Sequence, residues 1–156
     1  MDDGYIERAI VWLQGLSKGV DTHELESIAL SGLSIDHAEK GLVRCKFTIT
    51  DLACNDDGNW NNGAIAILID DICAAAICTV IGHIKVSVDL NISYYTQAKT
   101  GEEVEIEAKV IAHSGKLSSA VVNVKKCASD SGGVQIVAMA KQWMISVIRP
   151  NLSSML

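Results

Sequence analysis

The stretch that decides the fold is GAIAILIDDICAAAICTVI, residues 63–81, where every side chain is apolar or absent except Asp70, Asp71 and Thr79. A helix that is apolar on all sides is normally buried in a protein core or in a membrane. Carboxylates are seldom buried without a partner, because a buried charge is costly. The stretch therefore predicts a buried helix that ends at Gly82 and carries an acid with a chemical role.

A membrane-spanning helix is the alternative interpretation of the same stretch. Its length is marginal for a bilayer, which needs about 20 apolar residues. Each of the two central aspartates would cost about 2.5–3.5 kcal/mol even on a lenient insertion scale. We therefore expect a buried core helix and no membrane insertion.

The composition indicates one globular domain without a structural cofactor. The chain has 156 residues and a net charge of −6, which argues against a nucleic-acid-binding surface. Its five cysteines lack C-x-x-C spacing and its histidines are isolated, so we expect reduced thiols in an intracellular protein, no disulfide framework, no metal site and no cofactor. Within this domain, 1–20 is expected to hold an N-terminal helix, 30–148 the core and 149–156 a tail.

The segments around the apolar helix are predicted to form one more helix and several strands. Apolar residues at helical spacing predict a helix over 5–16 that breaks at Gly15 and Gly19. Alternation of apolar and polar residues predicts strands. Before the apolar helix we expect a first strand at 30–35, a turn at 36–41, a strand at 43–50 and a loop at 55–62. After it we expect strands near 86–94, 103–110, 120–124 and 134–147.

This order of elements predicts an α+β fold. Consecutive strands joined by tight turns pair antiparallel, and a sheet covers an apolar helix on one side. In the strand at 86–94, strict alternation puts Val86, Val88 and Leu90 on one face and Ser87 on the polar face. We expect a second subunit to supply part of the remaining cover for the helix.

Several segments then carry a resemblance to a known family. They are Asn55, the Asn-Asn-Gly at 61–63, LIDD at 68–71, VSVDLNISYY at 86–95, AKTGE at 98–102 and Gly115-Lys116. Over roughly 30–147 the chain resembles the hotdog-fold acyl-CoA thioesterases of the thioesterase superfamily member 2 kind, which are related to the phenylacetate-degradation thioesterases. The resemblance implies a curved antiparallel sheet of about five to six strands wrapped around a long central helix.

The resemblance also implies an active site. Asp70 takes the place of the family's catalytic carboxylate, acting as base or nucleophile, and Ser87 takes the place of a serine that assists it. Asn55 and the backbone N–H groups near Asn62 and Gly63 take the place of the groups that polarise the thioester carbonyl. The expected reaction is hydrolysis of acyl-CoA to a free acid and CoA, with coenzyme A present only as part of the substrate.

Substrate contacts and assembly follow from the same resemblance. Contacts with the substrate are implied for Tyr94, Tyr95, Lys99, Gly115 and Lys116. Taken alone, each of these lysines indicates a solvated surface residue, and Gly115-Lys116 in its tight turn is the best candidate. The family's site draws residues from both subunits of a dimer, and dimers often pair into tetramers. A homodimer or homotetramer is therefore expected.

One segment departs from the family pattern. The family usually has His-Gly-Gly at the start of the helix, whereas this chain has Asn61-Asn62-Gly63. A backbone N–H survives any change of side chain, so an oxyanion site can persist there. The departure leaves a second hypothesis, a hotdog protein that binds acyl-CoA without hydrolysing it. Hydration or dehydration of an acyl-CoA on the same fold is a third, weaker one.

The two ends of the chain bear on location. The first residues are acidic and lack the basic region of a secretory signal. The last three, Ser-Met-Leu, resemble the Ser-Lys-Leu peroxisomal address with its middle residue changed. We therefore expect the protein in the cytosol or the peroxisome.

Overall fold

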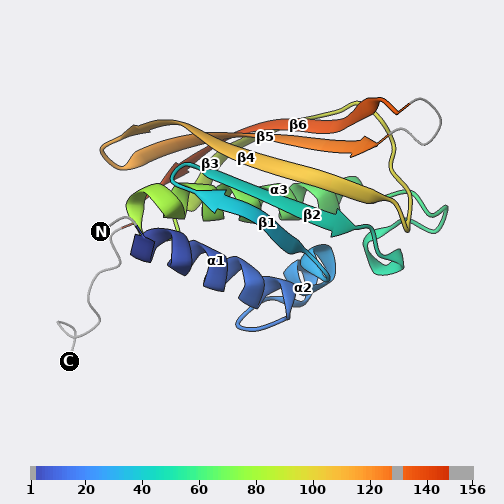
Figure 1. The fold of residues 1–156 in the computed structure, drawn as a ribbon, viewed down its shortest axis with the longest axis horizontal. Coiled ribbons are helices and arrows are strands. Elements are labelled where there is room, and N and C mark those ends of the chain that lie inside the picture. Colours follow the sequence, from blue (N-terminus) through green and yellow to red (C-terminus); the bar gives the residue numbers. More distant parts are fainter. Residues whose placement is uncertain (1–2, 128–131, 148–156) are drawn as a thin grey trace.

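The described residues form a single antiparallel sheet of six strands and three α-helices (Figure 1). The computed structural model describes residues 3–127 and 132–147. The helices are α1 (Asp3–Ser17), α2 (Glu24–Leu30) and α3 (Asn62–Ile81), with a short 3₁₀ turn, η1 (Asp51–Ala53), before α3. The strands are β1 (Ser34–Glu39), β2 (Leu42–Thr48), β3 (Val86–Tyr94), β4 (Glu103–Ser114), β5 (Leu117–Cys127) and β6 (Val134–Ile145). The predicted α+β class is confirmed.

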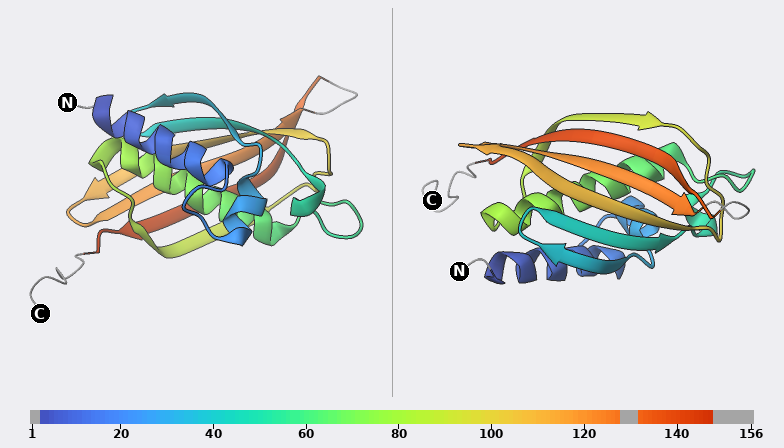
Figure 2. Two further views of the ribbon diagram at one scale, coloured as in Figure 1. Left: turned by 90° about the horizontal axis from the view of Figure 1, so that it is seen from below. Right: turned by 45° about the horizontal axis from the view of Figure 1, so that its top comes forward.

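The sheet curves around α3, and the helices α1 and α2 cover α3 on its other side (Figures 1 and 2). By length and composition α3 could cross a membrane, but most of its side chains are buried inside this protein. Its predicted end is also confirmed, because Gly82 takes the left-handed conformation, at φ +81°, and its N–H donates to the Cys78 carbonyl. The ring of Tyr5 packs so closely against Gly82 that a side chain there would collide with it.

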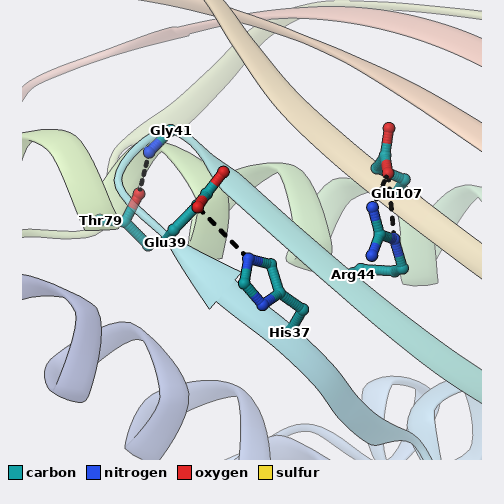
Figure 3. Close-up of polar contacts among 6 residues, drawn as sticks. All are labelled: His37, Glu39, Gly41, Arg44, Thr79 and Glu107. Carbon is teal, nitrogen blue, oxygen red and sulfur yellow. Dashed lines mark hydrogen bonds and ion pairs between the residues drawn. The ribbon is translucent and has the colours of Figure 1, made fainter.

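Thr79, a buried polar residue near the C-terminal end of α3, connects the helix to the β1–β2 hairpin (Figure 3). Its hydroxyl donates to the Ala76 carbonyl at 2.6 Å and accepts from the Gly41 N–H at 2.8 Å. In the same region Arg44 and Glu107 pair across β2 and β4, with 2.8 Å between nitrogen and oxygen. The buried Thr79 hydroxyl thus both donates and accepts a hydrogen bond, as is usual for buried polar groups.

The segment between α1 and β2 differs from the sequence prediction. Residues 30–35 were expected to form the first strand, but Glu24–Leu30 is a helix and the strand is Ser34–Glu39. The helix begins where the Glu26 carboxylate accepts from the Thr22 hydroxyl at 2.7 Å. Such local capping starts a helix that is too short to show a clear hydrophobic period.

The bounds of the first hairpin turn and of α1 also differ from the sequence prediction. The turn expected over 36–41 contains only Lys40 and Gly41, because β1 runs to Glu39. Gly41 has φ +80°, a conformation that favours glycine in a tight hairpin. The helix α1 continues through Gly15 to Ser17 and stops before Gly19, which has φ +74°.

The order of strands in the sheet is β1-β2-β4-β5-β6-β3. The expectation that consecutive strands pair is therefore wrong for β3 and β4. β3 pairs with β6 and lies at the edge of the sheet, so the connection from β3 to β4 crosses β5 and β6. The edge position matters because the outer side of β3 keeps backbone groups available for a partner strand.

Candidate active site

A β-bulge in β3 turns Ser87 toward α3. Ser87 pairs with Met144 and Asp89 pairs with Trp143, so Val88 is an extra residue in the ladder. Opposite residues of an antiparallel pair point to the same face, and Met144 is buried on the inner face. Ser87 therefore points inward. The prediction that it lies on the polar face is wrong, because strict alternation fails at the bulge.

This inward position brings Ser87 into contact with Asp70. The Ser87 hydroxyl donates to Asp70 Oδ1 at 2.5 Å. Gln142 Nε2, from β6, donates to Ser87 Oγ at 2.7 Å and also to Asp70 Oδ1. Among the described residues, nothing donates to Asp70 Oδ2. One carboxylate oxygen is thus fixed by two donors, while the other remains available to take a proton or to attack.

Gln142 is the member of this group that the sequence analysis missed. It has no exposed surface, and its Oε1 has no hydrogen-bond partner among the described residues. Leaving a buried oxygen unpaired costs free energy, which the two bonds from Nε2 help to offset. A sequence signal existed: on β6 the inward positions Ala138, Ala140 and Met144 are apolar, and Gln142 interrupts them.

The two neighbouring acids of α3 have different surroundings. Asp70 is half-buried, whereas Asp71 is only 5 % exposed. Burial raises the pKa of Asp71 to about 8, and the negative charges of Glu26 and Asp70 add to the effect. Asp71 is therefore protonated near neutral pH. From the sequence we expected Asp70 to be the reagent and Asp71, about 100° away around the helix, to be structural; of the two, Asp71 is the more deeply buried.

We expect this buried acid to make folding stability fall as pH rises. The folded state keeps the Asp71 proton up to about pH 8, whereas the unfolded chain loses it near its ordinary pKa of 3.8. Stability is lost progressively between these pH values, on the order of 2–5 kcal/mol. Asp71→Asn should remove that loss. In urea unfolding at pH 5 and pH 8, the free energy of unfolding of the variant should therefore increase relative to that of the parent as pH rises. A constant difference between the two proteins would contradict the prediction.

The start of α3 is organised by Asn61. Its Oδ1 accepts from the Gly63 N–H at 2.7 Å and from the Ala64 N–H at 3.2 Å, which makes it the N-cap of the helix. Its Nδ2 donates to Asn55 Oδ1 at 2.6 Å. The expectation that the Gly63 N–H serves a substrate needs correction, since that N–H is occupied. Among the described residues, the Asn62 N–H has no acceptor.

A cavity of about 420 Å³ opens at this helix start. It is lined by five of the predicted site residues, namely Asn55, Asn62, Gly63, Tyr94 and Tyr95. The Tyr94 hydroxyl donates to the Asn62 carbonyl at 2.9 Å, and burial raises the pKa of Tyr94. The structure therefore places these predicted residues around one opening.

The two predicted lysines lie far apart: Lys99 pairs with Asn59 at the edge of the helix-start cavity, whereas Lys116 lies in a distant turn. Lys99 is exposed, and its backbone N–H donates to the Glu102 carboxylate at 2.7 Å. Gly115 and Lys116 form the β4–β5 turn, where the Lys116 carbonyl accepts from Lys85 Nζ at 2.7 Å. The twelve residues of β4 separate that turn from the helix-start cavity by roughly 35 Å. Within one chain these lysines do not meet around a single ligand.

The candidate site thus falls into two halves within one chain. The first half is the carboxylate group of Asp70, Ser87 and Gln142, and the second is the helix start with the Asn62 N–H. Eight residues of α3 separate Asp70 from Asn62, which corresponds to about 12 Å along the helix. A single carbonyl cannot touch both halves of the same chain.

Comparisons with known proteins identify the family and the fold. Residues 57–129 match the family model of the thioesterase superfamily. Human acyl-coenzyme A thioesterase 13 is 33% identical over 96 residues, which cover 61% of this chain and 69% of the relative. The structure of zebrafish thioesterase superfamily member 2 superposes with a TM-score of 0.75 at 27% identity and covers 86% of this chain and 94% of the zebrafish chain.

A thioesterase protein of Streptococcus pneumoniae, solved with coenzyme A, shares the fold at 18% identity, with a TM-score of 0.66 over 74% of this chain and 88% of its own. This chain belongs to the thioesterase superfamily, as its sequence predicts. It is a thioester hydrolase built on the hotdog fold.

Proposed function

We propose that this protein hydrolyses acyl-CoA thioesters to a carboxylic acid and free CoA. The observation that carries the proposal is the Asp70 carboxylate, held by Ser87 and Gln142 with one oxygen left available. The naming of the human relative as an acyl-coenzyme A thioesterase supports the substrate class. The structure of the Streptococcus protein with coenzyme A supports a CoA-binding site on this fold.

In this proposal Asp70 acts as a general base. Its Oδ2 takes a proton from water, the water oxygen bonds to the thioester carbon, and the carbonyl oxygen becomes an oxyanion. The Asn62 N–H at the helix start donates to that oxyanion, and Asn55 lies beside it. The C–S bond then breaks, and the thiolate of CoA takes up the proton that Asp70 had accepted.

Direct attack by the carboxylate is the other route, and isotope labelling separates the two. In a single turnover in H₂¹⁸O, a general base puts one ¹⁸O into the product acid and none into Asp70, whereas hydrolysis of an acyl-aspartyl intermediate at the aspartyl carbonyl puts one ¹⁸O into the carboxyl of Asp70 and none into the acid. If water attacks the acyl carbonyl of that intermediate instead, only the acid is labelled, and detection of the acyl-aspartyl enzyme by rapid quench and mass spectrometry then identifies the route. Mass spectrometry of the peptide that contains Asp70 reports the result.

We further propose a homodimer formed along β3. This strand lies at the sheet edge, and its side chains Val86 and Val88 are about half exposed, at 49 % and 55 %. An unpaired apolar edge strand is a ready surface for pairing with another strand. A second copy is the occupant that the site itself requires, because one chain holds its two halves too far apart.

Twofold pairing of β3 would bring the two halves together. In an antiparallel pair about the middle of β3, the Tyr94 end of one strand faces the Ser87 end of the other. Within each subunit, Tyr94 is hydrogen-bonded to Asn62, and Ser87 is hydrogen-bonded to Asp70. The helix start of one subunit would then lie against the carboxylate group of its partner, and the dimer would contain two composite sites.

Mixing two inactive variants tests this arrangement. Asp70→Asn disables one half and Asn62→Pro disables the other, so each homodimer is expected to be nearly inactive. After subunit exchange, half of the dimers are mixed, and each mixed dimer has one intact site, so activity should return to about a quarter of the parent value. If the mixture stays as inactive as its components while mass spectrometry detects mixed dimers, the two halves do not come from different subunits.

Binding of acyl-CoA without hydrolysis, the second hypothesis from the sequence, is the outcome that would overturn the proposed function. The observation that favours it is Asn61, which occupies the Gly63 N–H that an oxyanion could otherwise use. A CoA-release assay over short, long and aromatic acyl-CoAs decides between the two. Release that depends on Asp70 supports the enzyme, whereas tight binding with an intact thioester after long incubation supports the binding protein.

We also propose a tetrameric assembly and a location in the cytosol or the peroxisome. Pairing of the dimers into a tetramer follows the family pattern, and light scattering of the purified protein tests it. The proposed location, cytosol or peroxisome, depends on the last three residues, which lie outside the described part of the chain. Microscopy of the tagged protein with and without these three residues tests the location.

A further inference from the structure

A buried lysine lies directly before β3. Lys85 is 3 % exposed, and its Nζ donates to the Lys116 carbonyl at 2.7 Å and to Ser118 Oγ at 2.8 Å. Burial lowers the pKa of Lys85, and no carboxylate among the described residues offsets that effect. Because a charged group is costly to bury, an apolar residue would suit this position better on packing grounds alone.

The Lys85 side chain crosses the inner face of the sheet below β6. In the sheet β6 lies between β3 and β5, and the partners of Lys85 lie on β5 and in the β4–β5 turn. Ser118 and Ser87 both pair with Met144, so these three residues form one row across the sheet. Ser118 Oγ also lies 2.8 Å from His113 Nδ1, so it can donate there while it accepts from Lys85. Lys85 therefore connects the start of the edge strand to the far side of β6.

The start of β3 could pair with β6 in two ways. The observed pairing contains the bulge at Val88 and turns Lys85 and Ser87 inward. Without the bulge, the residues before Leu90 would move by one position, and Val86 and Val88 would turn inward instead. Strict alternation favours this regular pairing, since it would remove two half-exposed valines from water. The bulged pairing therefore needs a contact that the regular pairing lacks.

We propose that Lys85 is a positioning residue that fixes the register of β3 and thereby turns Ser87 toward Asp70. This inference rests on the proposed function. In the regular pairing Lys85 would point to the outer face and lose its contacts with Lys116 and Ser118. The bulged pairing keeps both contacts, and hydrogen bonds from a charged donor are stronger than those between neutral groups. Lys85 and Ser87 turn inward together because they are two positions apart on one strand.

Lys85→Met should lower kcat by about as much as Ser87→Ala does. Methionine is apolar and of similar length, so it suits the buried position but cannot donate a hydrogen bond. A hydrogen bond to a charged group corresponds to about 10–100-fold in rate, and both variants remove the one from Ser87 to Asp70. Lys109→Met, at an exposed position of β4, is the matched control and should keep the parent kcat.

Two double variants separate positioning from a general loss of stability. If Lys85 acts through Ser87, Lys85→Met/Ser87→Ala should be no slower than the slower single variant, whereas independent losses would multiply. Val88→Thr should in turn reduce the effect of Lys85→Met. Threonine has the shape of valine, but its hydroxyl disfavours the inward position that the regular pairing gives to residue 88. The loss caused by Lys85→Met should therefore be smaller when it is measured against Val88→Thr than against the parent.

Cross-strand NOEs report the register without any assay of activity. In the parent, Val86 lies opposite Ile145, whereas the regular pairing places it opposite Ser146. Lys85→Met should exchange the first set of NOEs for the second. Ser118→Ala removes one acceptor and leaves the lysine in place, so it should show both sets and a several-fold loss of kcat that disappears in the Ser87→Ala background. It provides the test if Lys85→Met fails to fold.

The possible outcomes separate this proposal from the proposed function. A parent-like kcat in Lys85→Met, multiplied losses in its double variant with Ser87→Ala, or Val86–Ile145 NOEs that persist unchanged in both Lys85→Met and Ser118→Ala would overturn the role of Lys85. If the parent protein hydrolyses no acyl-CoA, the proposed function fails, and the NOEs alone still decide whether Lys85 fixes the register.

Discussion

Asp70→Asn should lower kcat for acyl-CoA hydrolysis by about 10²–10⁴-fold, the usual contribution of a general base. An amide has nearly the same shape as the carboxylate, and its oxygen can still accept from Ser87 and Gln142. The substitution therefore removes the proton acceptor and keeps the local packing. Initial rates of CoA release, measured with a thiol reagent at saturating substrate, give the ratio.

Asp71→Asn is the matched control for that experiment. It changes the neighbouring acid of the same helix, and Asp71 is already protonated at neutral pH because its pKa is about 8. Its conversion to an amide should therefore leave kcat within a few-fold of the parent. If Asp71→Asn loses as much activity as Asp70→Asn, or if Asp70→Asn keeps the parent rate, Asp70 is not the base.

The second large effect concerns a single N–H group. Asn62→Pro should lower kcat by about 10²–10³-fold, the typical cost of losing one oxyanion donor. Asn62 is the first residue of α3, where proline is well tolerated because its missing N–H has no helical partner. The preceding residue, Asn61, already has φ −68° and ψ 130°, which is the extended conformation that proline requires before it.

Asn62→Ala separates the backbone from the side chain at this position. It keeps the N–H and removes only the amide side chain, so its kcat should stay close to the parent value. Thermal unfolding of both variants checks that α3 still begins at the same residue. If Asn62→Ala and Asn62→Pro lose activity equally, the side chain rather than the N–H is what matters, and the assigned donor is wrong.

Individual helices and strands were predictable where one physical signal was strong, whereas the pairing of β3 with β6 was not. The apolar run of α3 and its end at Gly82 follow directly from hydrophobicity and from the freedom of glycine. The strands after α3 follow from regular alternation. The helix α2 was not predictable, because seven residues hold too few periods and its start depends on a contact between Thr22 and Glu26.

The candidate site was predictable only in part. The resemblance identified Asp70, Ser87 and Asn55, but it gave no reason to select Gln142 or Asn61. Gln142 acts through pairing of β6 with β3, two strands that the sequence does not show to be neighbours. Asn61 could have been recognised, since an asparagine directly before an apolar helix is a common N-cap.

The bulge at Val88 has a consequence for how such chains are compared. The direction of Ser87 depends on how many residues separate it from Leu90, and not on what those residues are. An alignment that leaves no gap for the extra residue Val88 shifts Ser87 by one position. It then matches Ser87 with outward-facing positions of other strands. In this strand, the spacing determines whether Ser87 reaches Asp70, and residue identity alone does not.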